Sequence, residues 1–185
     1  MKIRTFIALE LENNILDKII EMRDKLNGSN NSVKWEPRNK LHITLKFLGD
    51  TNTEIIDELC TKLKNKISDT NSFFLESTKF GLFKNISEPK ILWFGFRESE
   101  ELLKLVNDIE EISEAFGFER ERRKFKSHLT LLRIKDYQAP LDYENILNYQ
   151  PEHLKFRAEK ISLIESTLQK SGSIYKTNTS FYLKK

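Results

Sequence analysis

The sequence of 185 residues has few of the residues that build disulfide scaffolds and phosphate-binding loops. Its only cysteine is Cys60, so no disulfide can form within the chain, and a lone thiol fits a reducing compartment. Its six glycines are spaced to give neither Gly-x-Gly-x-x-Gly nor a Walker-type loop. The sequence therefore does not predict an enzyme that binds a nucleoside triphosphate through such a loop.

Long hydrophobic runs are also missing. No stretch reaches the ~18 consecutive apolar residues that a membrane-spanning helix needs. The apolar run from Ile3 to Leu9 is too short for a signal peptide and ends at Glu10. We therefore expect a cytoplasmic protein that does not act at a membrane. The formal net charge of +3 is too small to indicate binding to duplex nucleic acid, but it suits a small anionic substrate.

Histidine is scarce, yet two of the three histidines begin the same motif. His42 begins His-Ile-Thr-Leu, and His128, which lies 86 residues further along, begins His-Leu-Thr-Leu. Alternating aliphatic and β-branched residues around both motifs predict β-strands. Side chains at positions i and i+2 of a strand point to the same face. Each histidine should therefore share a face with the threonine of its own motif, Thr44 or Thr130.

Strict alternation also predicts where the neighbouring side chains point. On the first strand, the residues expected on the buried back face are Leu41, Ile43, Leu45 and Phe47. Lys46 has the same parity as His42, so it should either add positive charge to the site or lie in solvent at the end of the strand. Arg133 has the opposite parity to His128. It could reach the site only through a β-bulge or beyond the strand, and a surface or lobe-bridging role fits equally well.

Two histidines and two threonines can act on a phosphodiester without a metal ion. An unperturbed histidine has a pKa near 6.5, so a neutral imidazole can take a proton from water while an imidazolium gives one to the leaving oxygen. Each threonine hydroxyl can donate a hydrogen bond to a non-bridging phosphate oxygen. A metal site would need more ligands, and His153 stands alone in a polar segment. We expect no metal and no cofactor, and these residues alone do not distinguish the acid from the base.

The hydrophobic pattern predicts an α+β fold with a weak internal duplication. Helical spacing of apolar residues predicts helices at about 13–26, 51–67 and 99–116. Alternating segments predict strands at 3–9, 41–48, 73–80, 91–96, 128–133, 155–164 and 174–183. Each half contains a strand, a helix and a His-x-Thr strand. We expect one domain over residues 1–185, with two pseudo-symmetric lobes of antiparallel or mixed sheet, helices outside and a central cleft.

A charged run leads directly into the second motif. Its basic residues are Arg120, Arg122, Arg123, Lys124 and Lys126, and its acidic residues are Glu119 and Glu121. As a functional feature, the run would line the mouth of the cleft and hold an RNA backbone. The alternative is a solvated surface segment. Trp35 or Phe125 could stack a base, although either could instead belong to the core.

At these residues the chain resembles the two-histidine phosphoesterase superfamily. Within it, the sequence is most similar to the RNA 2′,3′-cyclic phosphodiesterases, first described as 2′-5′ RNA ligases. The likeness runs from Arg4-Thr5-Phe6-Ile7-Ala8-Leu9 through both motif blocks to Glu165-Ser166-Thr167-Leu168 with Gly172 and Tyr175. It implies a bilobal fold and hydrolysis of 2′,3′-cyclic phosphate RNA ends to 2′-phosphates. It also implies that His42 is the proton donor and His128 the proton acceptor. Ser127 departs from the family, which often has proline there.

The resemblance leaves several functions open. The expected partners are RNA or oligonucleotides with a 2′,3′-cyclic phosphate end and small nucleotides, bound by a monomer. Thr44, Thr130, Arg133 and Lys46 are the residues expected to bind substrate. The alternatives are reversible 2′-5′ RNA ligation, a phosphodiesterase for another cyclic phosphate or a 2′-5′ linkage, and a non-catalytic RNA- or nucleotide-binding module. The presence of both His/Thr pairs favours an enzyme, because a binding module needs no proton-transfer groups.

Overall fold

The computed structural model describes residues 1–27, 33–135, 141–170 and 172–185. The strands are β1 Lys2–Glu10, β2 Ile43–Asn52, β3 Phe73–Phe83, β4 Ile91–Phe96, β5 His128–Arg133, β6 Lys155–Ala158, β7 Lys160–Gln169 and β8 Gly172–Tyr182. The helices are α1 Asn13–Asn27, α2 Ile56–Ser68, α3 Glu100–Ala115 and α4 Tyr143–Asn148, with short 3-10 turns at Arg38–Lys40 and Thr53–Ile55. The three long helices lie close to the predicted positions.

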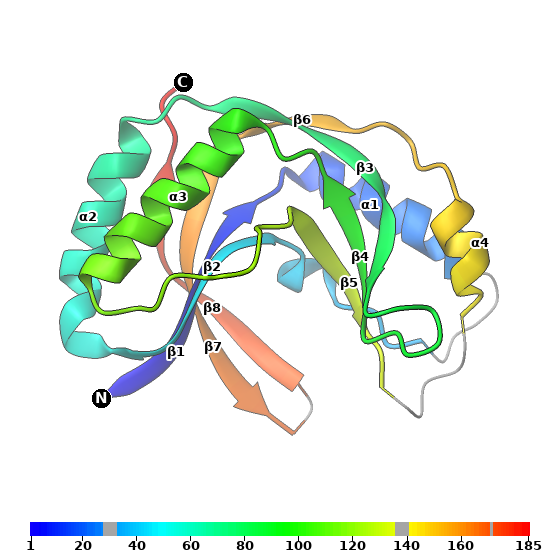
Figure 1. The fold of residues 1–185 in the computed structure, drawn as a ribbon, viewed down its shortest axis with the longest axis horizontal. Helices are drawn as coiled ribbons and strands as arrows, with labels where there is room; N and C mark the ends of the chain where they lie inside the picture. Colours follow the sequence, from blue (N-terminus) through cyan, green and yellow to red (C-terminus); the bar gives the residue numbers. More distant parts are fainter. Residues whose placement is uncertain (28–32, 136–140, 171) are drawn as a thin grey trace.

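The strands form one curled sheet in the order β6-β3-β4-β5-β2-β1-β7-β8, and all neighbouring strands are antiparallel. Two halves of four strands meet where β2 lies beside β5 (Figure 1). The predicted α+β fold with two lobes is therefore confirmed. The prediction of one strand over 155–164 is wrong. The chain forms two strands there, because β6 pairs with β3 in one half whereas β7 pairs with β1 in the other.

The predicted duplication is visible in the order of the elements. One half supplies β1, α1 and the motif strand β2, and the other supplies β4, α3 and the motif strand β5. Helix α3 crosses over to pack on β2 and beside α2, which packs on β8. Figure 1 shows α2 and α3 over one half of the sheet and α1 and α4 over the other. Among the described residues, no helix is long and apolar enough to cross a membrane.

Helix α3 forms because its sequence supplies both a cap and an apolar face. The Ser99 side chain accepts a hydrogen bond from the Leu102 backbone N–H at the start of the helix. The buried apolar side chains are Leu102, Leu105, Val106 and Ile109, which recur at helical spacing. Burial of this stripe fixes the helix on the sheet. The polar side chains at its other positions can then face the space beside the motif strands.

The two motifs meet at the centre of the sheet. Ile43 of β2 pairs with Leu129 of β5, and both side chains are fully buried. In an antiparallel pair, the residue before one partner faces the residue after the other. The register therefore brings His42 next to Thr130 and His128 next to Thr44. Residues far apart in the sequence thus lie side by side on one face, as the spacing of the motifs predicted.

Candidate active site

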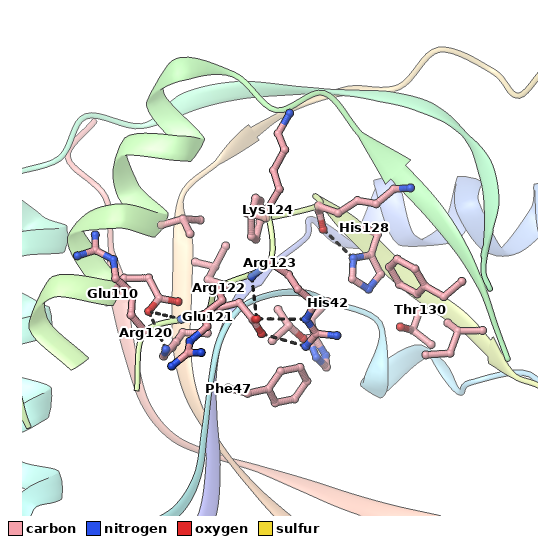
Figure 2. A pocket seen from close by; sticks show the side chains of 18 of the residues that line it. His42, Phe47, Glu110, Arg120, Glu121, Arg122, Arg123, Lys124, His128 and Thr130 are labelled. Atoms are coloured by element: carbon pink, nitrogen blue, oxygen red, sulfur yellow. Dashed lines mark hydrogen bonds and ion pairs between the residues drawn. The ribbon is translucent and has the colours of Figure 1, made fainter. Parts of the chain in front are cut away.

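A cleft of about 1060 Å³ lies over the two motif strands and is also bordered by α3 and the segment 119–126. The six residues expected to act on or bind substrate all line it: His42, Thr44, Lys46, His128, Thr130 and Arg133. Figure 2 shows His42, His128 and Thr130 on one side of this space, with Glu110, Arg120 and Glu121 on the other. The cleft is the place where the predicted site residues converge.

A β-bulge brings Arg133 to the cleft. In the pairing of β5 with β4, Leu131 has no partner of its own, so the alternation of side chains shifts by one residue. Leu131 and Leu132 are both buried, and Arg133 returns to the face that carries His128. The Arg133 Nε lies 3.2 Å from Glu36 Oε1 at the edge of the cleft. Arg133 thus reaches the site in the way that the sequence analysis required.

A second β-bulge, in β2, overturns the expectations that Phe47 lies on the buried back face and that Lys46 is solvated. Leu45 is left out of the pairing with β1, so Lys46 lies opposite Ile7 of the core and Phe47 lies opposite Phe6. Phe47 is therefore not on the buried back face, because it is 63% exposed and lines the cleft. Lys46 is not solvated, because it is only 4% exposed. Strict alternation fails at both positions for one reason, the extra residue at Leu45.

Phe47 is a candidate that the sequence analysis missed. Phe47 lies five residues after His42, and Arg133 lies five residues after His128. Both side chains line the cleft. Comparison of the two motif strands position by position is the signal that could have revealed it. Of the aromatic residues that were considered, Phe125 also lines the cleft and is partly buried. Trp35 packs against the core, with the Arg23 guanidinium 5.4 Å from its ring centre.

Lys46 makes a buried ion pair that anchors the segment 119–126. Its Nζ lies 2.6 Å from Glu110 Oε2 on α3 and 2.6 Å from the carbonyl oxygen of Glu119. The Glu121 backbone N–H donates to the same Glu110 carboxylate, at 3.3 Å. The ion pair therefore joins β2, α3 and the start of the segment. These contacts occupy two of the three N–H donors of the Lys46 ammonium. A role for Lys46 in substrate binding stays a prediction.

His128 is held by its own backbone and by aromatic rings. Its Nδ1 lies 2.7 Å from the Lys126 carbonyl oxygen, so in the neutral form Nδ1 carries the hydrogen and Nε2 keeps its lone pair. The imidazole and the Phe83 ring are nearly perpendicular, with their centres 4.8 Å apart. Burial lowers the pKa of His128, and the charges of Lys126 and Arg133 lower it further, against the raising effect of the Lys126 carbonyl.

His42 has a matching environment in the other half. Its ring stacks on Phe6 at 4.9 Å and hydrogen bonds to the backbone of Lys40, two residues earlier, as His128 does with Lys126. Burial lowers the pKa of His42 to about 4, and the Arg133 guanidinium adds to this effect. Both imidazoles are therefore neutral at pH 7 in the free protein. An anion bound between them would favour a proton on one of them.

The third histidine lies outside this cleft. The His153 Nε2 is 3.7 Å from Glu76 Oε2 on an exposed part of the surface. Within residues 1–27, 33–135, 141–170 and 172–185, no three His, Cys, Asp or Glu side chains are grouped as a metal ion would require. The chemistry that the described residues supply at the cleft is proton transfer by two imidazoles and hydrogen bonding by hydroxyls and cations.

Comparison with known proteins agrees with this arrangement. The sequence model of a family described as LigT like Phosphoesterase matches residues 9–93 and 96–175. A protein of Archaeoglobus fulgidus named RNA 2′,3′-cyclic phosphodiesterase is 31% identical, over 94% of this chain and 96% of its own. A protein of Thermotoga maritima with the same name is 28% identical, over 94% of this chain and 91% of its own.

Solved structures show the same fold. The crystal structure of a Thermus thermophilus protein has a TM-score of 0.79 and 24% identity, and the match covers 97% of each chain. E. coli LigT, crystallised with 3′-AMP, has a TM-score of 0.79 and 21% identity, and the match covers all of both chains. The curled sheet and its helices are therefore shared with these proteins.

Arg133 should influence the protonation of both histidines. We expect Arg133→Gln to raise the pKa of His42 and of His128, because it removes a positive charge that disfavours each imidazolium. The change should be larger at His42, where the Arg133 charge has the largest effect on the pKa after burial. NMR titration of the imidazole protons would measure both values. Arg157→Gln, on the exposed face of β6, is the matched control. Unchanged or lower values in Arg133→Gln would contradict the electrostatic account.

The buried ion pair should be important for stability. Lys46→Met leaves Glu110 buried without its partner, so we expect the free energy of unfolding to fall by about 3–5 kcal/mol. The double variant Lys46→Met with Glu110→Leu should lose less, because no unpaired charge remains. The exposed Lys64→Met should change stability by less than about 0.5 kcal/mol. Urea denaturation would compare the three, and equal losses in Lys46→Met and Lys64→Met would refute this role.

Proposed function

The chain belongs to the family of LigT-like phosphoesterases, and we propose that it hydrolyses the 2′,3′-cyclic phosphate at the end of an RNA strand to a 2′-phosphate. The names of the Archaeoglobus fulgidus and Thermotoga maritima relatives support this reaction. The observation that carries the proposal is the pairing of β2 with β5, which sets two His/Thr pairs on the floor of one cleft. Such a site offers an acid, a base and two hydroxyl donors around one phosphate.

The reaction needs one proton transfer from each imidazole. His128 accepts a proton from water through the nitrogen that faces away from the Lys126 carbonyl, and the water oxygen forms a bond to phosphorus. The bond from phosphorus to the 3′ oxygen breaks, and His42 gives its proton to that oxygen. Thr44 and Thr130 donate hydrogen bonds to the non-bridging oxygens, where negative charge increases. The two roles follow the family resemblance, because the two halves are nearly symmetric.

The lowered pKa values of the histidines suit a site for an anion. Before an anion binds, burial keeps both imidazoles neutral at pH 7. A cyclic phosphate brings a negative charge close to them, which raises the pKa of the nearer imidazole and allows it to hold a proton. Substrate binding and protonation of the acid therefore support each other. A neutral molecule of the same shape would gain nothing from this effect.

Phe47 and Arg133 flank the phosphate site from the two halves. The Phe47 ring is largely exposed in the cleft, and it lies 5.8 Å from the Phe6 ring on which His42 also stacks. A phenyl ring and a guanidinium plane can both stack on a nucleobase. Because every base has such a face, these contacts hold the terminal nucleotide without strong base preference.

The remaining expectations belong to the same proposal. We place the protein in the cytoplasm, where the free thiol of Cys60 would remain reduced. It acts as a monomer without a cofactor, because each step above uses its own side chains. Its substrates include small cyclic nucleotides as well as RNA ends, because the clamp contacts the phosphate.

Removal of either histidine should abolish most of the turnover. We expect His42→Ala and His128→Ala each to lower kcat by about 10²–10⁴, the usual contribution of a positioned acid or base. The double variant should be little worse than the poorer single variant if the two act as a unit. His153→Ala, outside the cleft, is the matched control. The assay uses RNA ending in a 2′,3′-cyclic phosphate with excess EDTA, and phosphorus NMR resolves the products. Near-normal turnover in either variant, or a dominant 3′-phosphate, would contradict the proposed roles.

The plot of kcat/KM against pH should be bell-shaped, with a fall at low pH and another at high pH. The reaction requires a single proton on the pair, carried by His42 while His128 is neutral. Before substrate binds, burial lowers the pKa of His42 the more, so this productive form is a minor fraction of the singly protonated pair, and the pH profile follows the population of that pair. As the pH falls below about 4, the lowered pKa of His42, both become protonated, and kcat/KM falls. As the pH rises above the lowered pKa of His128, both become neutral, and kcat/KM falls again. The optimum of kcat/KM should therefore lie on the acid side of the ordinary histidine pKa. Values of kcat/KM that still rise through neutral pH would exclude this pair of groups.

A further inference from the structure

The segment 119–126, between α3 and β5, forms one wall of the cleft along its whole length. Its five basic and two acidic side chains give it a formal charge of +3, which equals the net charge of the entire protein. The rest of the chain is therefore balanced overall. The excess positive charge lies beside the reactive site, where it raises the local concentration of anions.

The wall is held in place rather than left as a free surface segment. Its first residues are fixed by the buried Lys46 and Glu110, which contact the Glu119 carbonyl and the Glu121 N–H. At its other end, the Lys126 ammonium lies 4.0 Å from the centre of the Trp93 ring. A segment fixed at both ends presents its charges in a defined position. It can therefore bind an extended ligand with little loss of conformational entropy.

The basic side chains of the wall differ in how well they are already paired. Arg123 lies 3.0 Å from Glu121, and Arg120 lies 3.5 Å from Glu114 on α3. Arg122 is exposed and has no ion pair with a described residue. Lys124 is exposed and lies 3.8 Å from Glu98, at the outer limit of an ion pair. Figure 2 shows Lys124 extending away from His42 and His128, so its charge is placed for a group outside the catalytic clamp.

A cyclic mononucleotide would leave this wall unused. It carries one negative charge, which the His/Thr pairs and Arg133 already surround. Each nucleotide on the 5′ side of the cyclic end adds one phosphate. We infer that the 119–126 wall binds the phosphates of the nucleotides that precede the cyclic end, so that oligonucleotides are better substrates than mononucleotides. This inference rests on the proposed function. An acidic peptide would match the charge but would place no phosphate between the histidines.

A length series tests the inference. The substrates are a cyclic mononucleotide and a dinucleotide, tetranucleotide and hexanucleotide that end in a 2′,3′-cyclic phosphate. We expect kcat/KM to rise with length, chiefly through KM. Arg122→Gln with Lys124→Gln should raise KM for the hexanucleotide roughly tenfold, because an exposed charge contact is worth about three- to fivefold. The ratio of kcat/KM between hexanucleotide and mononucleotide should fall accordingly.

The salt dependence gives a second measurement. Each phosphate contact to a single strand contributes about 0.7 to the slope of log affinity against log salt. The double variant should therefore show a shallower slope for the hexanucleotide product, which ends in a 2′-phosphate, in fluorescence anisotropy. The matched control is Lys62→Gln with Lys64→Gln, which removes the same charge from exposed positions of α2. It should behave as the wild type does.

The outcomes separate this inference from the proposed function. Absence of turnover on every cyclic-ended substrate would overturn the proposed function itself. Turnover that does not depend on length would overturn only the role of the wall. A length preference that survives in Arg122→Gln with Lys124→Gln would also overturn only the role of the wall. A preference that is lost equally in the α2 control would do so too. A loss of the preference in the wall variant alone supports the inference.

Discussion

The site depends on the pairing of Ile43 with Leu129, where the two halves of the sheet join. Both side chains are fully buried, so the join is stabilised by the core behind it. On the opposite face, the same register sets His42 beside Thr130 and His128 beside Thr44. Beyond this point the two strands no longer pair, and the space between the halves becomes the cleft. One short contact therefore creates both the clamp and its access to solvent.

The sequence predicts most of this arrangement because the motifs repeat and the strands alternate. Two His-x-Thr-Leu segments were enough to predict which four side chains converge. The sequence could not predict that Leu45 and Leu131 are bulged, because a leucine in a bulge looks like any other aliphatic residue of a buried strand. The misplacement of Lys46 and Phe47 follows from that alone.

The boundary between β6 and β7 was missed for a different reason. Apolar residues alternate at 156 and 158 and again at 161 and 163, with a change of phase at Glu159-Lys160, and a single strand with a bulge there is compatible with this sequence. The chain is divided there because its two parts pair with different partners, β3 on one side of the sheet and β1 on the other. Tertiary pairing decides this boundary, because the change of phase at Glu159-Lys160 does not by itself distinguish a bulge from a break between two strands.

The positive charges of the cleft differ in how strongly they lower the pKa values of the histidines. Arg133 lowers the pKa of both imidazoles and Lys126 that of His128, and a charge as close to His42 as Arg133 makes the protonated acid harder to form. Further cations at that distance would favour substrate binding but oppose protonation of His42. The first four basic residues of the wall avoid this conflict, because the start of the segment is anchored on Lys46 and Glu110, and of the wall's charges only that of Lys126 acts on the pKa of a histidine. The buried ion pair thus allows a strongly positive surface to share the cleft with an acid whose pKa burial has already lowered.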